Sequence, residues 1–185
     1  MTTERLFYGV PFPVEIAHRL ERIVSATPDI ADRAGPSANW HVTLRFLGST
    51  DTTRRQAITE AVDAAPLPRA FRTRTSGWGA FPRAAAAKIF WIGLADPDGH
   101  LNTIVSTLEA AARAAGFTPE ERPFRPHVTL ARFRRPIDLK STIDGLPVIR
   151  TSFLIDRFVL FRSTLGSGAP RYEPVEVHRL LPPQP

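Results

Sequence analysis

The chain has 185 residues and contains no cysteine, which excludes disulfide bonds and thiolate metal sites. Lysine is also scarce: Lys88 and Lys140 are the only lysines among 24 basic residues. No long apolar run occurs near the start, because Pro11 and Pro13 interrupt the segment 6–14. A signal peptide and a membrane span are therefore not expected. We expect a cytoplasmic protein with no membrane partner.

Several common catalytic signatures are missing as well. The chain has no Gly-x-x-x-x-Gly-Lys loop for nucleotide phosphates and no Gly-x-Ser-x-Gly nucleophile turn. It has no His-Glu-x-x-His pair, and a zinc site needs three or four His, Cys or carboxylate ligands. We therefore expect no metal and no cofactor.

What the chain does have is arginine, and a formal net charge of +6. The guanidinium group presents a planar fork of donors that suits phosphate, so an anionic partner is one interpretation. A GC-rich genome, which favours arginine codons regardless of function, is the other. Charge alone does not decide between them.

Hydrophobic periodicity and turn residues predict an alternation of strands and helices. A helix over 51–65 would begin with Asp51 as its N-cap, and Gly116 would follow the end of another. The expected strands are 6–10, 40–46, 71–78, 89–94, 127–133, 149–162 and 172–177, and the expected helices are 14–25, 51–65, 99–115 and 138–143.

One succession of elements occurs twice in this order. A strand, a helix and a loop precede His-Val-Thr-Leu at 41–44, and the same succession precedes His-Val-Thr-Leu at 127–130. Repeat arrays usually need three or more units, so two copies favour a pair of lobes related by a pseudo-twofold axis. We expect a single bilobal α+β domain over 1–185.

Side chains alternate between the two faces of a strand, so His41 and Thr43 point the same way, as do His127 and Thr129. Such a set suits attack on a phosphodiester. One neutral imidazole can accept a proton from water while the other, as imidazolium, protonates the departing oxygen. Threonine hydroxyls and an arginine can hold the phosphate oxygens. A single His-x-Thr is a weak signal that more often marks a surface strand, but neither a surface nor a core histidine explains its duplication.

The other three histidines, His18, His100 and His178, have no such partner motif. We expect each of them to lie on the surface.

At these residues the sequence resembles the 2H phosphoesterase superfamily, and within it the RNA 2′,3′-cyclic phosphodiesterases, or 2′-5′ RNA ligase-like proteins. The resemblance covers most of the chain. It includes Arg5-Leu-Phe7, His41-Val-Thr-Leu-Arg-Phe-Leu-Gly48, Gly79-Ala-Phe-Pro82, Arg122-Pro-Phe-Arg-Pro-His-Val-Thr-Leu-Ala-Arg132, and Leu160-Phe-Arg-Ser163 with Tyr172.

The resemblance implies a bilobal 2H phosphoesterase fold, each lobe a small antiparallel sheet backed by helices. It implies hydrolysis of a 2′,3′-cyclic phosphate at an RNA end to a 2′-phosphomonoester, without a cofactor. His41 would be the proton donor and His127 the proton acceptor. The phosphate would be bound by Thr43, Thr129, Arg132 and Arg45.

Alternatives remain open from the residues alone. The acid and the base could exchange roles, because the two lobes are formally alike. ATP-independent 2′-5′ RNA ligation is the reverse reaction at the same site. The substrate could be a small cyclic-phosphate nucleotide, such as an ADP-ribose cyclic phosphate or an oligoadenylate, and the chain could bind RNA ends without turnover. We expect a monomer.

Overall fold

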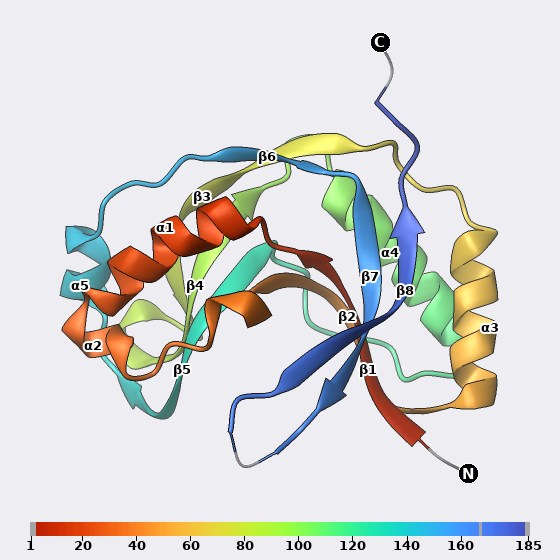
Figure 1. Cartoon of the computed structure of the whole chain (residues 1–185), viewed down its shortest axis with the longest axis horizontal. Helices are drawn as coiled ribbons and strands as arrows, with labels where there is room; N and C mark the ends of the chain where they lie inside the picture. Colours follow the sequence, from red (N-terminus) through yellow and green to blue (C-terminus); the bar gives the residue numbers. More distant parts are fainter. Residues whose placement is uncertain (1–2, 167, 184–185) are drawn as a thin grey trace.

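The computed structural model describes residues 3–166 and 168–183, and within them the strands form a single eight-stranded sheet (Figure 1). All strand pairs are antiparallel. The elements in chain order are β1 (Thr3–Pro11), α1 (Val14–Ser25), α2 (Pro28–Ala31), η1 (Ser37–Asn39), β2 (His41–Asp51), α3 (Thr52–Asp63), β3 (Phe71–Phe81), η2 (Ala84–Ala86), β4 (Ala87–Ala95), α4 (His100–Ala114), β5 (His127–Ile137), α5 (Lys140–Gly145), β6 (Ser152–Ile155), β7 (Arg157–Thr164) and β8 (Arg171–Arg179).

The sheet consists of two four-stranded halves that meet edge to edge. Its strand order is β6-β3-β4-β5-β2-β1-β7-β8, so β5 of one half adjoins β2 of the other. The two strands pair at a single position, where Val42 lies opposite Val128. The repeated motifs therefore lie side by side at the seam. The predicted α+β fold with two related lobes is confirmed.

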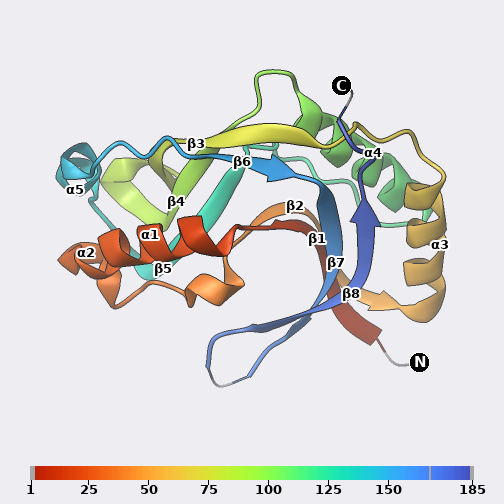
Figure 2. The ribbon, with the colours of Figure 1, turned by 45° about the horizontal axis from the view of Figure 1, so that its top comes forward.

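Helices lie beside both halves of the sheet (Figures 1 and 2). In both views, one half of the sheet, with β3, β4 and β5, lies beside helices α1, α2 and α5. The other half, with β1, β2, β7 and β8, lies beside helices α3 and α4. Helix α1 follows β1 and helix α4 follows β4, so each of these two helices crosses to the opposite half. The two halves are therefore connected by helices as well as by the pairing of β2 with β5.

The helices form where the sequence predicts them. Leu101, Ile104 and Leu108 in α4 are fully buried on one face, as their spacing indicates. The Asp51 carboxylate accepts a hydrogen bond from the backbone N–H of Arg54, which caps the first turn of α3. Gly116 has a φ of 77°, the left-handed conformation that ends α4 without a steric penalty.

The prediction of one long strand over 149–162 is wrong. The chain forms two strands instead: β6 pairs with β3 in one half, and β7 pairs with β1 in the other. Asp156 separates them, and its carbonyl accepts a hydrogen bond from the N–H of Leu180. The charged pair Asp156-Arg157 interrupts the apolar pattern at this point, but the pattern does not show that the chain changes partners.

The expectation for the remaining histidines is correct for His18, which is exposed, and wrong for His178, which is only 6% exposed. His178 lies opposite Phe158 in β7, and the two rings stack with centroids 4.9 Å apart. Its Nδ1 lies 2.8 Å from an Asp63 carboxylate oxygen in α3. Pairing between β7 and β8 therefore turns this histidine inward. His100 is half-buried.

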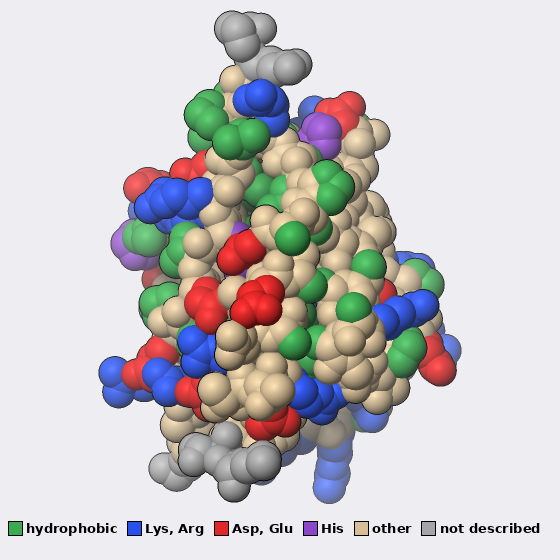
Figure 3. All heavy atoms as spheres, turned by 90° about the vertical axis from the view of Figure 1, so that its right-hand side faces the viewer, with side chains coloured by type: hydrophobic (Ala, Val, Ile, Leu, Met, Phe, Trp, Pro, Cys, Tyr) green, Lys and Arg blue, Asp and Glu red, His purple; other side chains and the backbone are tan. Residues whose placement is uncertain are grey.

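The surface carries charges of both signs. On the face that Figure 3 shows, acidic and basic side chains are intermixed. Arg55 of α3, for example, forms ion pairs with Glu4 of β1 and Glu176 of β8. Within residues 3–166 and 168–183, no helix is both long and apolar enough to cross a membrane.

Candidate active site

The two motifs lie on adjacent strands and present the same side chains to one face. Val42 and Val128 are fully buried and opposite each other, so their neighbours along the strands point to the other face. In the antiparallel order, Thr43 and His127 lie on one side of the valine pair, and His41 and Thr129 on the other. All four of these side chains are half-buried. The alternation predicted from the sequence therefore holds in both strands.

Each imidazole is held by the same kind of hydrogen bond. Nδ1 of His41 lies 2.7 Å from the carbonyl oxygen of Asn39, and Nδ1 of His127 lies 2.6 Å from that of Arg125. A carbonyl can only accept, so both rings carry a proton on Nδ1, which leaves Nε2 as the reactive nitrogen. Nε2 of His41 lies 3.0 Å from the Thr43 hydroxyl. The carbonyl two residues before each histidine sets its tautomer.

The pKa of both histidines lies below the ordinary value. The pKa of His41 is lowered to about 4: burial is the largest cause, the Asn39 hydrogen bond opposes it, and the positive charge of Arg132 and the neighbouring His127 act in the same direction as burial. Burial also lowers the pKa of His127, again with Arg132 acting in the same direction and the Arg125 hydrogen bond opposing it. Both imidazoles are therefore neutral near pH 7 in the free protein. Arg132 acts on both, so it lies within electrostatic reach of the pair.

Aromatic rings surround each histidine. The ring of His41 lies 4.8 Å from that of Phe7 and 5.2 Å from that of Tyr172. His127 lies 5.0 Å from Phe81, edge to face, and 6.0 Å from Trp91. These apolar walls exclude water from the imidazoles, which accounts for their lowered pKa.

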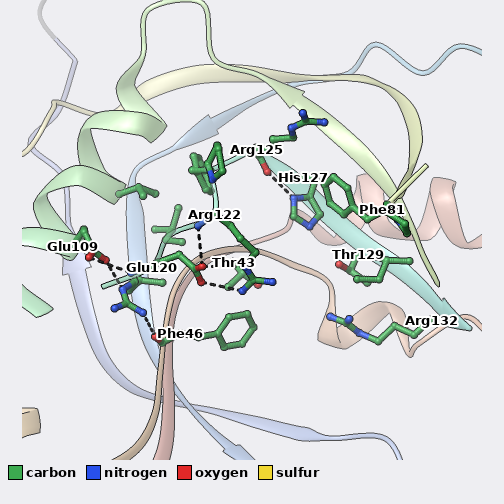
Figure 4. A pocket seen from close by; sticks show the side chains of 17 residues that line it. Thr43, Phe46, Phe81, Glu109, Glu120, Arg122, Arg125, His127, Thr129 and Arg132 are labelled. Atoms are coloured by element: carbon green, nitrogen blue, oxygen red, sulfur yellow. Dashed lines mark hydrogen bonds and ion pairs between the residues drawn. The ribbon is translucent and has the colours of Figure 1, made fainter. Parts of the chain in front are cut away.

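A cleft of about 590 Å³ opens over this face (Figure 4). Thr43, His127, Thr129 and Arg132 line it together. His41 is not among the lining residues, but its Nε2 is within hydrogen-bonding distance of Thr43, which is. One cleft therefore contains five of the six predicted site residues, Arg45 included, and His41 directly adjoins it.

Arg45 lines the cleft as well, but a bulge in β2 shifts it out of the alternation that His41 and Thr43 follow. Gly9 of β1 lies opposite Thr43, and the next residue, Tyr8, lies opposite Arg45, so Leu44 is the extra residue of the bulge. The Arg45 side chain is only 8% exposed. Its Nε lies 2.7 Å from a carboxylate oxygen of Glu109. Its guanidinium group is engaged by Glu109 and by two backbone carbonyls, and the prediction that Arg45 binds phosphate stays a prediction.

A matching bulge in β5 has the opposite effect on Arg132. Trp91 lies opposite Thr129 and the next residue of β4, Phe90, lies opposite Ala131, so Leu130 is the extra residue here. Beyond it, Ala131 is buried and Arg132 returns to the face that carries His127. Without this bulge, strict alternation would direct Arg132 away from the cleft.

The structure adds residues to which the sequence analysis gave no role. Phe46 is 46% exposed and lines the cleft at the position equivalent to Arg132 in the other motif. Alignment of the two motifs would have indicated this equivalence. The backbone carbonyls of Asn39 and Arg125 carry no sequence signal, because any residue supplies one. The additional cleft residues are Phe46, Phe81, Glu120, Arg122, Phe124 and Arg125.

Metal ligands do not gather at this site. In the part of the chain that the structure describes, no group of three or more His, Asp or Glu side chains is arranged to hold an ion. The cleft and the residues directly beside it instead offer two imidazoles whose Nδ1 atoms are held by carbonyls, two hydroxyls and a guanidinium group. This is the set of groups that general acid–base chemistry on a phosphate ester requires.

Comparisons with known proteins define the class to which this fold and site belong. The model of the 2′-5′ RNA ligase superfamily matches residues 12–166, and the chain belongs to that superfamily. The chain is similar to a Thermus thermophilus protein named RNA 2′,3′-cyclic phosphodiesterase, with 30% identity over 93% of this chain and 88% of the relative. It is 35% identical to an Aeropyrum pernix protein of the same name over 57% of this chain.

The alignments differ in how much of each relative they include. The chain spans 59% of the length of the Aeropyrum pernix protein and also 59% of that of a Geobacillus stearothermophilus relative. Among solved structures, Escherichia coli LigT complexed with 3′-AMP superposes with a TM-score of 0.81 over 97% of this chain and 99% of the other, at 24% identity. That likeness establishes the shared fold.

Proposed function

We propose that the protein hydrolyses 2′,3′-cyclic phosphate ends of RNA to 2′-phosphomonoesters. The observation that carries this proposal is the pair of imidazoles on adjacent strands, each with Nδ1 bound to a backbone carbonyl. His127 lines the cleft with Arg132, and Nε2 of His41 lies 3.0 Å from the hydroxyl of Thr43, which lines it too. The family of the chain and the names of its relatives give the substrate class.

In the proposed reaction, His127 acts as the base and His41 as the acid. Nε2 of His127 accepts a proton from water, and the water oxygen forms a bond to phosphorus. The bond between phosphorus and the 3′ oxygen breaks, and the imidazolium of His41 donates its proton to that oxygen. The 2′ ester bond remains, so the product is a 2′-phosphomonoester, and the two histidines exchange protonation states.

Thr43, Thr129 and Arg132 hold the non-bridging oxygens of the phosphate. Their charge grows as water attacks, and a guanidinium group with two hydroxyls stabilises it most where the cleft is shielded from water. No step of this scheme requires a metal ion. Arg45 has no part in it, because its donors are engaged by Glu109 and backbone carbonyls.

The low pKa of His41 indicates how the acid acquires its proton. In the free protein, Arg132 and His127 disfavour the imidazolium form. A bound phosphate anion neutralises Arg132 and attracts a second positive charge, so substrate binding raises the pKa of His41. The productive arrangement of protons therefore forms in the complex with substrate.

Hydrolysis of a short RNA ending in a 2′,3′-cyclic phosphate, with EDTA present, tests the proposal. We expect the wild type to open the ring to a 2′-phosphate and the double variant His41→Ala/His127→Ala to lose this activity. His18→Ala is the matched control, because His18 is exposed on α1 and outside the cleft. Hydrolysis that EDTA abolishes, or that the double variant retains, would contradict the proposal.

Ligation is a second candidate, which the name of the matching superfamily favours. A ribose 5′-hydroxyl would replace water as the nucleophile: it would lose its proton to His127 and form a bond to phosphorus, while the bond to the 3′ oxygen breaks and that oxygen takes a proton from His41. Measuring joined and hydrolysed products over a range of RNA concentrations separates the two reactions. The cytoplasmic location and the monomeric state expected from the sequence stay predictions.

A further inference from the structure

One wall of the cleft is a loop, residues 118–125, with little backbone support. It precedes β5 and contributes Glu120, Arg122, Phe124 and Arg125 to the cleft lining. Pro119 and Pro123 within it have no N–H to donate. In the described part of the chain, no backbone–backbone hydrogen bond joins this loop to another segment. Side chains must therefore determine its position.

Arg45 and Glu109 supply that support from the adjoining strand and helix. Nη2 of Arg45 lies 2.5 Å from the carbonyl oxygen of Thr118, and its Nη1 lies 2.5 Å from that of Phe46. Glu109 of α4 binds Nε of Arg45 through one oxygen and accepts the backbone N–H of Glu120, at 3.2 Å, through the other. The pair therefore connects β2, α4 and the start of the wall.

The ion pair of Arg45 and Glu109 has the chemistry to hold these segments in a fixed position. Burial would raise the pKa of Glu109, but the hydrogen bond from Arg113 and the charge of Arg45 hold it below the ordinary value, so the carboxylate is ionised. The planar guanidinium group donates to these three acceptors in fixed directions. At the equivalent position in the second motif stands Ala131, so only one half of the site has this device.

We propose that Arg45 and Glu109 are positioning residues, which fix the wall 118–125 and thereby the orientation and tautomer of His127. The connection is direct. Arg125 is the last residue of the wall, and its carbonyl is the one that binds Nδ1 of His127. Within the wall, Arg122 donates to Glu120 and holds the pKa of that carboxyl at about 2, so these two side chains are paired with each other. The proposal rests on the function proposed above for His127.

The test compares variants by nitrogen NMR of the histidine rings and by steady-state kinetics. Removal of one charge would leave the other buried and unpaired, so the main variant is Arg45→Met/Glu109→Leu, which removes both. We expect His127 to shift from the Nδ1–H form toward a mixture with Nε2–H, while His41, held by Asn39, keeps its spectrum. We expect kcat to fall about ten- to a hundredfold, because a misplaced base reacts slowly.

Arg54→Met is the matched control. Arg54 of α3 also donates to carbonyls near this loop, but to those of Ala115 and Gly116 at the end of α4, before the wall begins. We expect this variant to leave the His127 tautomer and kcat unchanged. A milder variant, Glu109→Gln, keeps the shape of the side chain and should shift His127 in the same direction by less.

The outcomes are separable. A folded double variant in which His127 keeps the Nδ1–H form and kcat stays within about twofold of the wild type would overturn the proposal. If the double variant does not fold, an unchanged His127 spectrum in Glu109→Gln overturns it equally. The NMR measurement needs no substrate, so it decides the positioning role even if the wild type proves inactive on RNA ends.

Discussion

His41 and His127 carry opposite roles in the proposed reaction, although each donates Nδ1–H to a carbonyl two residues earlier in the chain. Their surroundings, rather than their motifs, distinguish them. Burial lowers the pKa of both, and that of His41 reaches about 4. At the scale of single residues, substrate binding must therefore change the protonation state of His41, which has to become an imidazolium to act as the acid.

The pH dependence of kcat/KM should reflect these lowered pKa values. The active form of the free protein carries one proton on the pair, and that form declines once the pH exceeds the pKa of both histidines. We therefore expect kcat/KM to peak below pH 6.5 and to fall about tenfold per pH unit above it. Bound phosphate raises both pKa values, so kcat should peak at a higher pH. A kcat/KM that stays flat from about pH 6.5 to 8 would contradict this account.

Replacement of Arg132 by glutamine should change the pH profile as well as the rate. The Arg132 charge lowers the pKa of both histidines, so its loss should move the kcat/KM optimum to higher pH. Loss of a bidentate phosphate partner should also lower kcat/KM by about a hundredfold. Arg134→Gln, two residues along β5 and exposed, is the matched control. An Arg132→Gln optimum at the wild-type pH would show that Arg132 does not act on the histidines.

At the scale of strands and helices, local patterns predicted most of the fold. The spacing of Leu101, Ile104 and Leu108 was sufficient for α4, and Asp51 correctly marked the start of α3. The division of 149–162 into β6 and β7 was not predictable, because it depends on which distant strand each part joins. The directions of Arg45 and Arg132 depend on bulges, which shift alternation by one residue without a sequence mark.

Comparison of the two motifs with each other indicates that Arg45 and Arg132 point in different directions. In that alignment Arg45 matches Ala131, and Arg132 matches Phe46. Both strands show the same burial from His41 to Leu47 as from His127 to Phe133. The internal repeat therefore contains information about side-chain direction that a single strand does not.

The close pairing of β3 with β4 beside His127 gives a prediction at this scale. Gly79 lies opposite Trp91, and a Cβ atom at Gly79 would overlap the indole ring. We expect Gly79→Ala to lower the free energy of unfolding by about 1–3 kcal/mol and to lower kcat, because Trp91 contacts the His127 environment. Gly35→Ala, where a Cβ meets open space, should change neither. Thermal unfolding and kinetics of both variants provide the check.

At the scale of the whole molecule, the site exists only at the seam between two halves of one sheet. Each half supplies one histidine and one threonine, and a single pair, Val42 and Val128, joins the strands that carry them. Helices α1 and α4 each follow a strand of one half and lie beside the other half (Figure 2). Duplication of the motif was visible in the sequence, but the register that brings the copies together required the structure.

The central claim is that the two halves act in one chemical step, and comparison of single and double histidine variants tests it most directly. Groups that act as a unit show strongly non-additive losses. We expect His41→Ala and His127→Ala each to lower kcat on a 2′,3′-cyclic phosphate RNA end by about a thousandfold or more, and the double variant to lose little beyond either single one. Losses that multiply in the double variant, or a single variant that keeps kcat within about tenfold of the wild type, would contradict a shared acid–base step.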